Sequence, residues 1–220
     1  GGTAIYRQWG ERLRSTNVYS ALLPGRERRL GEPPIGDMRL LIDRMLPAFL
    51  SLADRPFVLF GHSMGALIAY ELAIRLRAHD MCPRHLIVSA YRSPECPKRR
   101  VLHPLPDTEF VDELRGYGGT QANVLAQPEL MEILLPMIRA DFRLHETYVF
   151  TNRPPLNCPV TAIVATRDQH VAEDEMTAWA DKTDRSFALM RIDGSHFYIS
   201  ESPDSALAIV QDCIDGLTSH

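Results

Sequence analysis

The sequence lacks the features of a membrane protein, a secreted protein and a small cysteine-based scaffold. No apolar run approaches the roughly 20 residues that a membrane-spanning helix needs, and no signal-peptide pattern opens the chain. The four cysteines lie far apart with no C-x-x-C pair, which fits neither a zinc site nor a disulfide scaffold. We therefore expect a cytoplasmic protein with no membrane partner, no metal and no cofactor.

Excess positive charge is missing as well. The 220 residues carry a formal net charge of −4, so no broad basic field is present to attract nucleic acid. Repeats and low-complexity tracts are also missing. With 45% hydrophobic residues, the chain has the balance of one globular domain, residues 1–220, and we expect a monomer. It opens at Gly1 without an initiator Met, so we expect that a native N-terminal segment precedes it.

Buried strands alternate with helices along most of the chain. Four apolar runs have the continuous hydrophobicity of strands that are covered on both faces of a parallel sheet: 56–60, 85–90, 160–166 and 187–192. A fifth strand is expected at 18–24, before the turn signal Pro24-Gly25. Helical spacing is present at 38–49, where Asp37 is the expected cap and Pro47 an expected kink, at 66–77, and after Ser202. This alternation predicts a doubly wound, mostly parallel α/β fold.

The stretch from about 92 to 150 interrupts the alternation. It lacks a convincing strand and separates two core strands. Apolar residues at helical spacing predict one helix around 110–114 and another around 130–142, with a kink at Pro136. Because these helices carry more apolar side chains than solvated helices need, we expect an inserted helical lid.

The clearest catalytic motif is Gly61-His-Ser-Met-Gly65. It matches G-x-S-x-G, the nucleophile elbow, in which a serine occupies a strained turn and the two glycines let strand and helix approach closely. The motif alone is weak evidence, and a structural turn serine is the alternative. Here it directly follows a buried strand and directly opens a helix, as the mechanism requires. This context predicts that Ser63 is a nucleophile.

A serine hydroxyl needs a base to take its proton and a carboxylate to hold that base, in the chain order Ser, Asp or Glu, His. Asp168 follows the strand that ends at Thr166, and His196 follows the strand that ends near Ile192. Both loops lie at the carboxyl ends of strands, the edge where the elbow also sits. We therefore expect Ser63, Asp168 and His196 to act together.

Other candidates for these roles are weaker. His170 lies two residues from Asp168 but departs from the usual order, and His62 is expected to pack beside the elbow. Asp193 and Asp174 are the rivals of Asp168 as the acid. A helix cap or a solvated loop charge is the ordinary role for each of these carboxylates.

The tetrahedral intermediate of acyl transfer also needs two N–H donors aimed at its oxyanion. The backbone N–H of Met64, the first helical residue after the nucleophile, is expected to be one. The second is expected from the loop after an early strand, which in this chain is the segment at Gly1-Gly2.

Several linked motifs resemble one enzyme family over nearly the whole chain. They are Gly1-Gly2-Thr3-Ala4 with Trp9, Leu23-Pro-Gly-Arg26 with Arg29-Leu-Gly-Glu-Pro33, Gly61-His-Ser-Met-Gly-Ala66, Leu135-Pro-Met-Ile-Arg-Ala-Asp-Phe142 with Glu146-Thr-Tyr148, and Gly194-Ser-His-Phe197. With them the sequence resembles the type II, or editing, thioesterases of polyketide and nonribosomal peptide synthesis, in the α/β-hydrolase superfamily. The Leu-Pro-Gly-Arg and Arg-Ala-Asp-Phe segments separate this family from lipases.

The resemblance implies a triad of Ser63, Asp168 and His196 under a helical lid, and an acyl-phosphopantetheine thioester on a carrier protein as substrate. Two other functions stay open: a medium-chain fatty acyl carrier protein hydrolase or general carboxylesterase, and a non-catalytic binding module on a hydrolase scaffold. An excised domain of a larger synthase is a further possibility. The basic run Lys98-Arg-Arg100 is either a contact for an acidic carrier protein or an ordinary solvated cluster.

Overall fold

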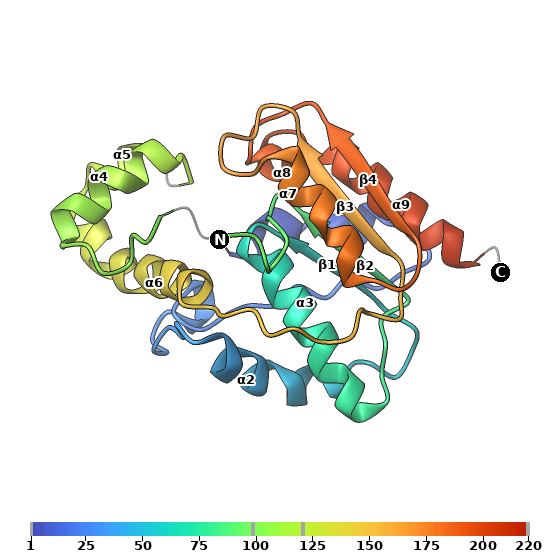
Figure 1. Cartoon of the computed structure of the whole chain (residues 1–220). Helices are drawn as coiled ribbons and strands as arrows, with labels where there is room; N and C mark the ends of the chain where they lie inside the picture. Colours follow the sequence, from blue (N-terminus) through green and yellow to red (C-terminus); the bar gives the residue numbers. More distant parts are fainter. Residues whose placement is uncertain (1, 98–99, 120–121, 219–220) are drawn as a thin grey trace. The chain divides into compact units, whose positions relative to one another are not determined.

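The computed structural model describes residues 2–97, 100–119 and 122–218 (Figure 1). They form two compact units. The sheet unit contains Thr3–Ser20, Ile42–Cys96 and the chain from Phe150 on, and the helical unit contains Gly2, Ala21–Leu41 and Pro97–Val149.

A four-stranded parallel sheet forms the centre of the sheet unit (Figure 1). The strands are β1 (Val58–His62), β2 (His85–Ser89), β3 (Val160–Ala165) and β4 (Phe187–Ile192), in the order β1-β2-β3-β4. They overlap the four apolar runs of the sequence, and β1 begins and ends two residues later than the run 56–60. The predicted parallel α/β architecture is therefore confirmed. Because the strands run in parallel, all four carboxyl ends reach the same edge of the sheet.

Helices cover both faces of this sheet. They are α1 (Trp9–Arg12), α3 (Met64–Leu76), α7 (Glu173–Thr177), α8 (Tyr198–Glu201) and α9 (Pro203–Thr218), with 3₁₀ turns η1 (Ala4–Tyr6), η3 (Arg77–His79) and η4 (Ala178–Lys182). On one face, Ile87 and Ile163 pack with α9 and Trp9 in a single buried cluster. Their neighbours in the strands point to the opposite face, where α3 packs on β1 and β2.

The helical unit has a small apolar core of its own. Its helices are α4 (Asp107–Tyr117), α5 (Ala122–Leu125) and α6 (Pro128–Glu146), and the turn η2 (Glu27–Arg29) belongs to the same unit. Phe110 is fully buried and meets Phe142 edge to face, with ring centroids 5.4 Å apart. The two helices expected in this stretch are therefore present, and α6 continues through Pro136.

The expected strand at 18–24 is wrong, because this segment has neither strand nor helix before the turn at Pro24-Gly25. A strand forms only where its backbone is hydrogen-bonded to a neighbouring strand. This segment instead leaves the sheet unit at Ser20 and enters the helical unit at Ala21. Its Leu22 carbonyl accepts a hydrogen bond of 2.7 Å from the Arg29 guanidinium.

Helix α2 (Met38–Leu50) begins as the sequence predicts. The Leu40 N–H donates to the Asp37 carboxylate at 2.8 Å, which caps the first turn. The helix then runs through Pro47 without being split. Within the described part of the chain, no helix combines the length and hydropathy that crossing a membrane requires.

Candidate active site

Ser63 occupies a strained turn between β1 and α3. The strand ends at His62, the helix begins at Met64, and Ser63 between them has φ 53° and ψ −130°. A positive φ is costly for a residue with a side chain and is typical of functional turns. A Cβ on Gly61 would lie 2.1 Å from the Gly65 carbonyl oxygen, so this position requires glycine. Gly65 is different: a Cβ there would meet no atom within 4 Å, so close packing explains only the first glycine of the motif.

The three side chains expected to act together form one hydrogen-bonded chain. His196 Nε2 lies 3.1 Å from Ser63 Oγ, and His196 Nδ1 lies 2.8 Å from Asp168 Oδ2. The His196 side chain is 5% exposed and that of Asp168 is fully buried. The imidazole is therefore held between a hydroxyl and a carboxylate, which is the arrangement that activates a serine.

Backbone hydrogen bonds join the loops that carry the acid and the base. The Thr166 N–H donates to Ile192 O and the Arg167 N–H donates to Gly194 O, both at 2.9 Å. These bonds extend the pairing of β3 with β4 beyond the sheet edge. A Cβ on Gly194 would lie 2.9 Å from Tyr198 Cβ, so glycine permits the tight loop that turns His196 inward.

Asp168 is held in its ionised form. Burial opposes ionisation, but the hydrogen bond and charge of His196 and two backbone N–H donors outweigh it and lower the pKa of Asp168 below its ordinary value. The two donors are His170 N at 2.7 Å and Val171 N at 3.2 Å, both to Oδ1. One carboxylate oxygen is thus fixed by the backbone, which leaves the other to orient His196.

The rival residues have other surroundings. Asp193 is 78% exposed, pairs with Arg167 and accepts a hydrogen bond of 2.9 Å from the Thr166 hydroxyl. Asp174 lies in the first turn of α7 and accepts a hydrogen bond from the Glu175 N–H at 2.9 Å. The His170 ring packs edge to face on His196, with ring centroids 5.0 Å apart. Asp168 is the carboxylate whose oxygen lies within hydrogen-bonding distance of His196 Nδ1.

Sequence reasoning missed a group of polar side chains beside these three. His62 Nδ1 lies 2.7 Å from Ser89 Oγ, and the same hydroxyl is hydrogen-bonded to the Tyr198 hydroxyl. Ser89 ends β2, and Tyr198 comes two residues after His196. The position of Ser89 at the carboxyl end of a predicted strand was the available signal for its place near the site.

The structure describes Met64, the first expected oxyanion donor, but only part of the segment expected to supply the second. Met64 is the first residue of α3, so its N–H has no acceptor within the helix. Of the second expected donor segment, Gly1 lies outside the described residues and Gly2 belongs to the helical unit. Groups of three or more potential metal ligands are missing among the residues that the structure describes.

Two of the motifs that carry the family resemblance meet in the helical unit. Arg26, from Leu-Pro-Gly-Arg, donates two hydrogen bonds to Asp141, from Arg-Ala-Asp-Phe, at 2.6 and 3.1 Å. Their side chains are only 6% and 16% exposed. A third motif residue, Glu146, accepts hydrogen bonds from the backbone N–H groups of Leu102 and His103 at 2.8 and 2.9 Å. These buried contacts attach α6 to segments that lie far from it in sequence.

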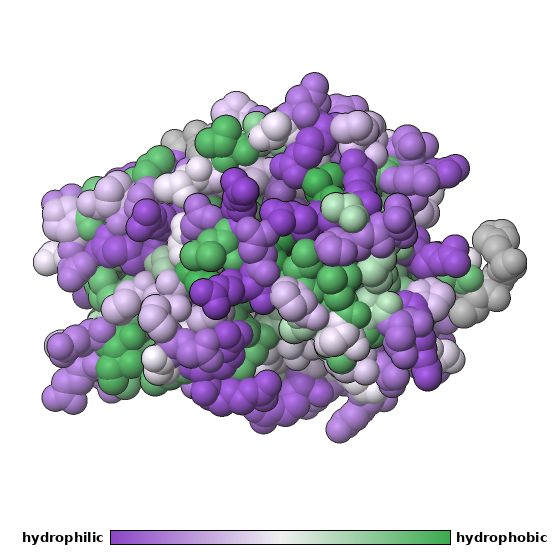
Figure 2. Space-filling model, turned by 90° about the horizontal axis from the view of Figure 1, so that it is seen from below, coloured by the Kyte–Doolittle hydropathy of each residue, from purple (hydrophilic) through white to green (hydrophobic). Residues whose placement is uncertain are grey.

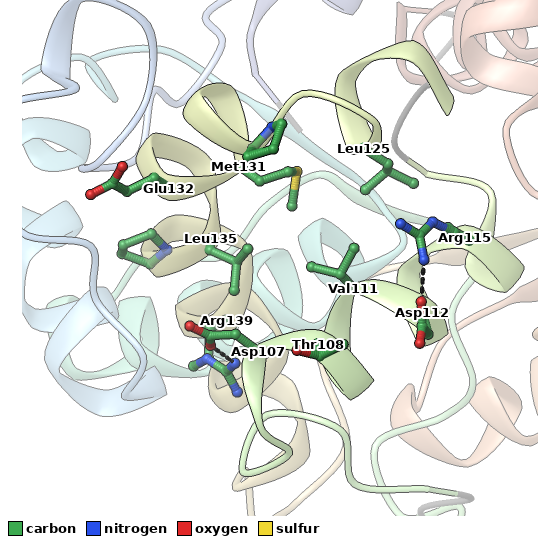
Figure 3. A pocket seen from close by; sticks show the side chains of 12 residues that line it. Asp107, Thr108, Val111, Asp112, Arg115, Leu125, Met131, Glu132, Leu135 and Arg139 are labelled. Atoms are coloured by element: carbon green, nitrogen blue, oxygen red, sulfur yellow. Dashed lines mark hydrogen bonds and ion pairs between the residues drawn. The ribbon is translucent and has the colours of Figure 1, made fainter.

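The helical unit also contains an open cavity of about 650 Å³ between α4, α5 and α6 (Figure 3). Val111, Leu125, Met131 and Leu135 form its apolar lining. Arg139, paired with Asp107, and Arg115, paired with Asp112, stand at its polar margin.

Large apolar side chains are also exposed outside this cavity. In the helical unit they are Leu30, Leu40, Val101, Leu130, Ile133 and Val149, and in the sheet unit Tyr19, Leu52 and Met190. On the face drawn in Figure 2, hydrophobic residues lie in small groups among hydrophilic ones.

Comparison with known proteins agrees with the fold. The family model for the thioesterase domain matches residues 1–216. The gramicidin S biosynthesis protein GrsT of Aneurinibacillus migulanus is 37% identical over 205 residues, which cover 92% of this chain and 80% of that protein.

Two solved structures are similar over almost the whole chain. The RedJ thioesterase from the prodiginine biosynthetic pathway in Streptomyces coelicolor has a TM-score of 0.90 and 36% identity, over 97% of this chain and 86% of its own. The type II thioesterase BorB from the borrelidin biosynthetic cluster has a TM-score of 0.87 and 35% identity, over 97% and 88%.

The parallel sheet, the strand–serine–helix turn and the structural neighbours define an α/β-hydrolase. The chain belongs to the thioesterase family, and it is a thioester hydrolase.

Proposed function

We propose that this enzyme hydrolyses acyl thioesters carried on the phosphopantetheine arms of carrier proteins, and so removes stalled or aberrant intermediates in polyketide or nonribosomal peptide synthesis. Relatives that cover most of the chain are named for such pathways: gramicidin S for GrsT, prodiginine for RedJ and borrelidin for BorB. The observation that carries the proposal is the hydrogen-bonded chain of Ser63, His196 and Asp168 in a member of this family.

The proposed reaction has two steps. Ser63 Oγ attacks the thioester carbonyl while His196 Nε2 takes its proton, and collapse of the tetrahedral intermediate breaks the C–S bond and releases the carrier thiol. Water then attacks the acyl-enzyme, with His196 as base, and frees the acid and the serine. Asp168 orients the imidazole and stabilises its positive form. The N–H of Met64, unpaired within α3, supplies one donor to the oxyanion.

Replacement of Ser63 tests the nucleophile. Ser63→Ala is expected to abolish thioester hydrolysis and labelling by a fluorophosphonate, because no other group forms the acyl-enzyme. Ser51→Ala is a matched control, since Ser51 is an exposed serine of the same unit whose hydroxyl donates a local hydrogen bond to Ala48 O at 2.8 Å. Full hydrolysis by Ser63→Ala would refute the assignment and favour a site elsewhere.

We infer that the helical unit contributes apolar surface to acyl recognition and acts as a lid. Support comes from its open apolar cavity and from its exposed apolar side chains. Leu135→Trp is expected to fill part of the cavity and to shift the preferred acyl chain toward shorter lengths, measured by mass spectrometry on a panel of loaded carriers. Unchanged chain-length preference would exclude this cavity from acyl binding.

Mobility of the lid is a separate expectation. In hydrogen–deuterium exchange, amides of 100–149 are expected to open more readily than those of β1, because lids are drawn from the less stable parts of a fold. Equal protection of the two regions would contradict a mobile lid.

Recognition of the carrier is the most specific part of the proposal. The same acyl group is expected to give a higher kcat/KM on a carrier protein than on N-acetylcysteamine, and the advantage is expected to shrink as salt rises, since about 0.1 M salt screens exposed charges beyond about 10 Å. In the basic run 98–100, Lys98 and Arg99 lie outside the described residues, and Arg100 pairs with Glu113 at 2.6 Å.

The charge-reversal test therefore uses Lys98→Glu with Arg99→Glu and keeps Arg100. This double variant is expected to lose carrier preference without slowing the small thioester. Equal efficiency on carrier and small thiol in the wild-type enzyme would favour a general carboxylesterase. The cytoplasmic location and the monomeric state stay predictions, and size-exclusion chromatography with light scattering tests the latter.

A further inference from the structure

Besides the hydrogen bond between the side chains of Ser63 and His196, a second chain of hydrogen bonds links residues that lie close to them in the sequence. This second connection consists of His62, Ser89 and Tyr198. It begins at His62, directly before Ser63, passes through the Ser89 hydroxyl, and ends at the hydroxyl of Tyr198, two residues after His196. In the sheet, His62 and Ser89 are register partners on the adjacent parallel strands β1 and β2. The three residues therefore come from the elbow, from a neighbouring strand and from the helix that follows the base.

Ser89 also holds the nucleophile through its backbone. Its carbonyl oxygen accepts a hydrogen bond of 2.8 Å from the Ser63 N–H, at the residue with the strained φ of 53°. Ala90, the next residue, has a φ of 50° and is fully buried, so the chain leaves β2 through a second strained position. Such strain persists only where the surroundings enforce it.

The connection is buried. Ser89 and Tyr198 have no exposed surface, and the His62 ring lies 5.4 Å from both the His196 and the Tyr198 rings, centroid to centroid. Burial, and secondly the charge of His196, lower the pKa of His62 to about 3, although Asp168 acts in the opposite sense. His62 is therefore neutral at pH 7, and it serves as a hydrogen-bond partner rather than as a second base.

The direction of the hydrogen bonds follows from counting donors. If Tyr198 donates to Ser89, and Ser89 donates to His62 Nδ1, then the ring proton of His62 is on Nε2. Among the described residues Nε2 has no hydrogen-bond partner at normal distance and angle, although the His196 backbone is near enough to act on the pKa of His62. The reverse direction leaves two groups without partners among the described residues, the Tyr198 hydroxyl proton and the His62 Nε2 lone pair. The first arrangement satisfies more of the buried groups and is favoured.

We propose that Ser89 is a positioning residue for the hydrolysis: its hydroxyl ties the strand before Ser63 to the helix after His196, and so maintains the 3.1 Å contact between Ser63 Oγ and His196 Nε2. The proposal rests on the proposed roles of Ser63 and His196. Ser89 itself touches no reacting atom. Its effect is carried by the two residues that flank the reacting pair.

The test compares Ser89→Ala and Tyr198→Phe, alone and combined, with a matched control. Thr161→Val is the control, because Thr161 is a buried hydroxyl on β3 that bonds to a histidine, His85, at 2.9 Å, toward the other end of the strands. Steady-state hydrolysis of an N-acetylcysteamine thioester, the rate of fluorophosphonate labelling and Tm are measured for each variant.

Loss of alignment is expected to lower kcat and the labelling rate together by roughly 10- to 100-fold, with KM nearly unchanged, since small misplacement of reacting groups slows the chemistry. The double variant is expected to be no slower than the worse single variant, because both substitutions break one network. Thr161→Val is expected to lower Tm while kcat and labelling stay at the wild-type level.

Opposite outcomes separate the two proposals. If Ser89→Ala and Tyr198→Phe keep wild-type kcat and labelling while Ser63→Ala abolishes both, the positioning role is wrong and the proposed function stands. If Ser63→Ala keeps full activity, the proposed function itself fails. If Ser89→Ala does not fold, Tyr198→Phe decides the question, because it keeps the buried ring and removes only the hydroxyl.

Discussion

The buried ion pair between Arg26 and Asp141 joins two of the family motifs, and its contribution to the free energy of unfolding can be measured. Removing one partner leaves a charge in a site where the guanidinium is 6% exposed and the carboxylate 16%. Loss of one member of a buried pair typically costs about 3–5 kcal/mol, because the remaining charge stays desolvated and uncompensated. Asp141→Ala is therefore expected to reduce the free energy of unfolding by about that amount.

Replacing both partners by apolar residues behaves differently. Arg26→Met with Asp141→Leu removes both charges, so its cost is expected to be well below the sum of the two single substitutions. Asp112→Ala is the matched control: it breaks the pair with Arg115 on α4, whose side chains are 61% and 55% exposed, and it is expected to cost no more than about 1 kcal/mol.

Urea denaturation gives these free energies, and hydrogen exchange in α6 shows whether the helical unit opens first. Equal small losses for Asp141→Ala and Asp112→Ala would refute the reasoning. Strict additivity of Arg26→Met and Asp141→Leu would refute it as well.

Three further predictions concern the sheet unit. Asp168→Asn is expected to lower kcat by up to about 10⁴-fold, by analogy with a triad protease. Asp193→Asn, at an exposed site, is expected to change kcat little. A large loss of kcat in Asp193→Asn alone would assign the role of the acid to Asp193. Gly61→Ala is expected to prevent folding or abolish activity, because its Cβ would lie 2.1 Å from Gly65 O, and a stable active variant by circular dichroism and turnover would contradict this. The pKa of Asp168 is lowered in the folded state, so its carboxylate stabilises the fold above its ordinary pKa. This stabilisation is expected to vanish as the pH falls through the folded-state pKa. Free energies of unfolding of the wild type and Asp168→Asn that fail to converge at low pH would contradict the lowered pKa.

The sheet and the arrangement of Ser63, Asp168 and His196 were accessible from sequence because both depend on short-range patterns. Continuous apolar runs mark strands that are buried on both faces, and parallel strands bring the residues that follow them to one edge. Once 56–60, 160–166 and 187–192 were identified as strands, the proximity of the three side chains followed from their places in the chain.

Other features depend on partners that a local pattern does not reveal. The segment 18–24 has the composition of a strand, but pairing decides whether a strand forms. Arg26 and Asp141 lie 115 residues apart, so their motifs were recognisable while their contact was not. Ser89 and Tyr198 resemble ordinary core positions, because a buried hydroxyl has no periodic signature.

The central claim is that Ser63 carries the acyl group during turnover. The direct measurement is mass spectrometry of peptides from the Asp168→Asn enzyme, quenched in acid soon after mixing with an acyl-loaded carrier protein, since slowed deacylation favours accumulation of the intermediate. The account predicts the mass of the acyl group, less one hydrogen, on the peptide that contains Ser63, and no such adduct in the protein that also carries Ser63→Ala. An adduct on a different residue, or acyl release that continues undiminished in Ser63→Ala, would contradict it.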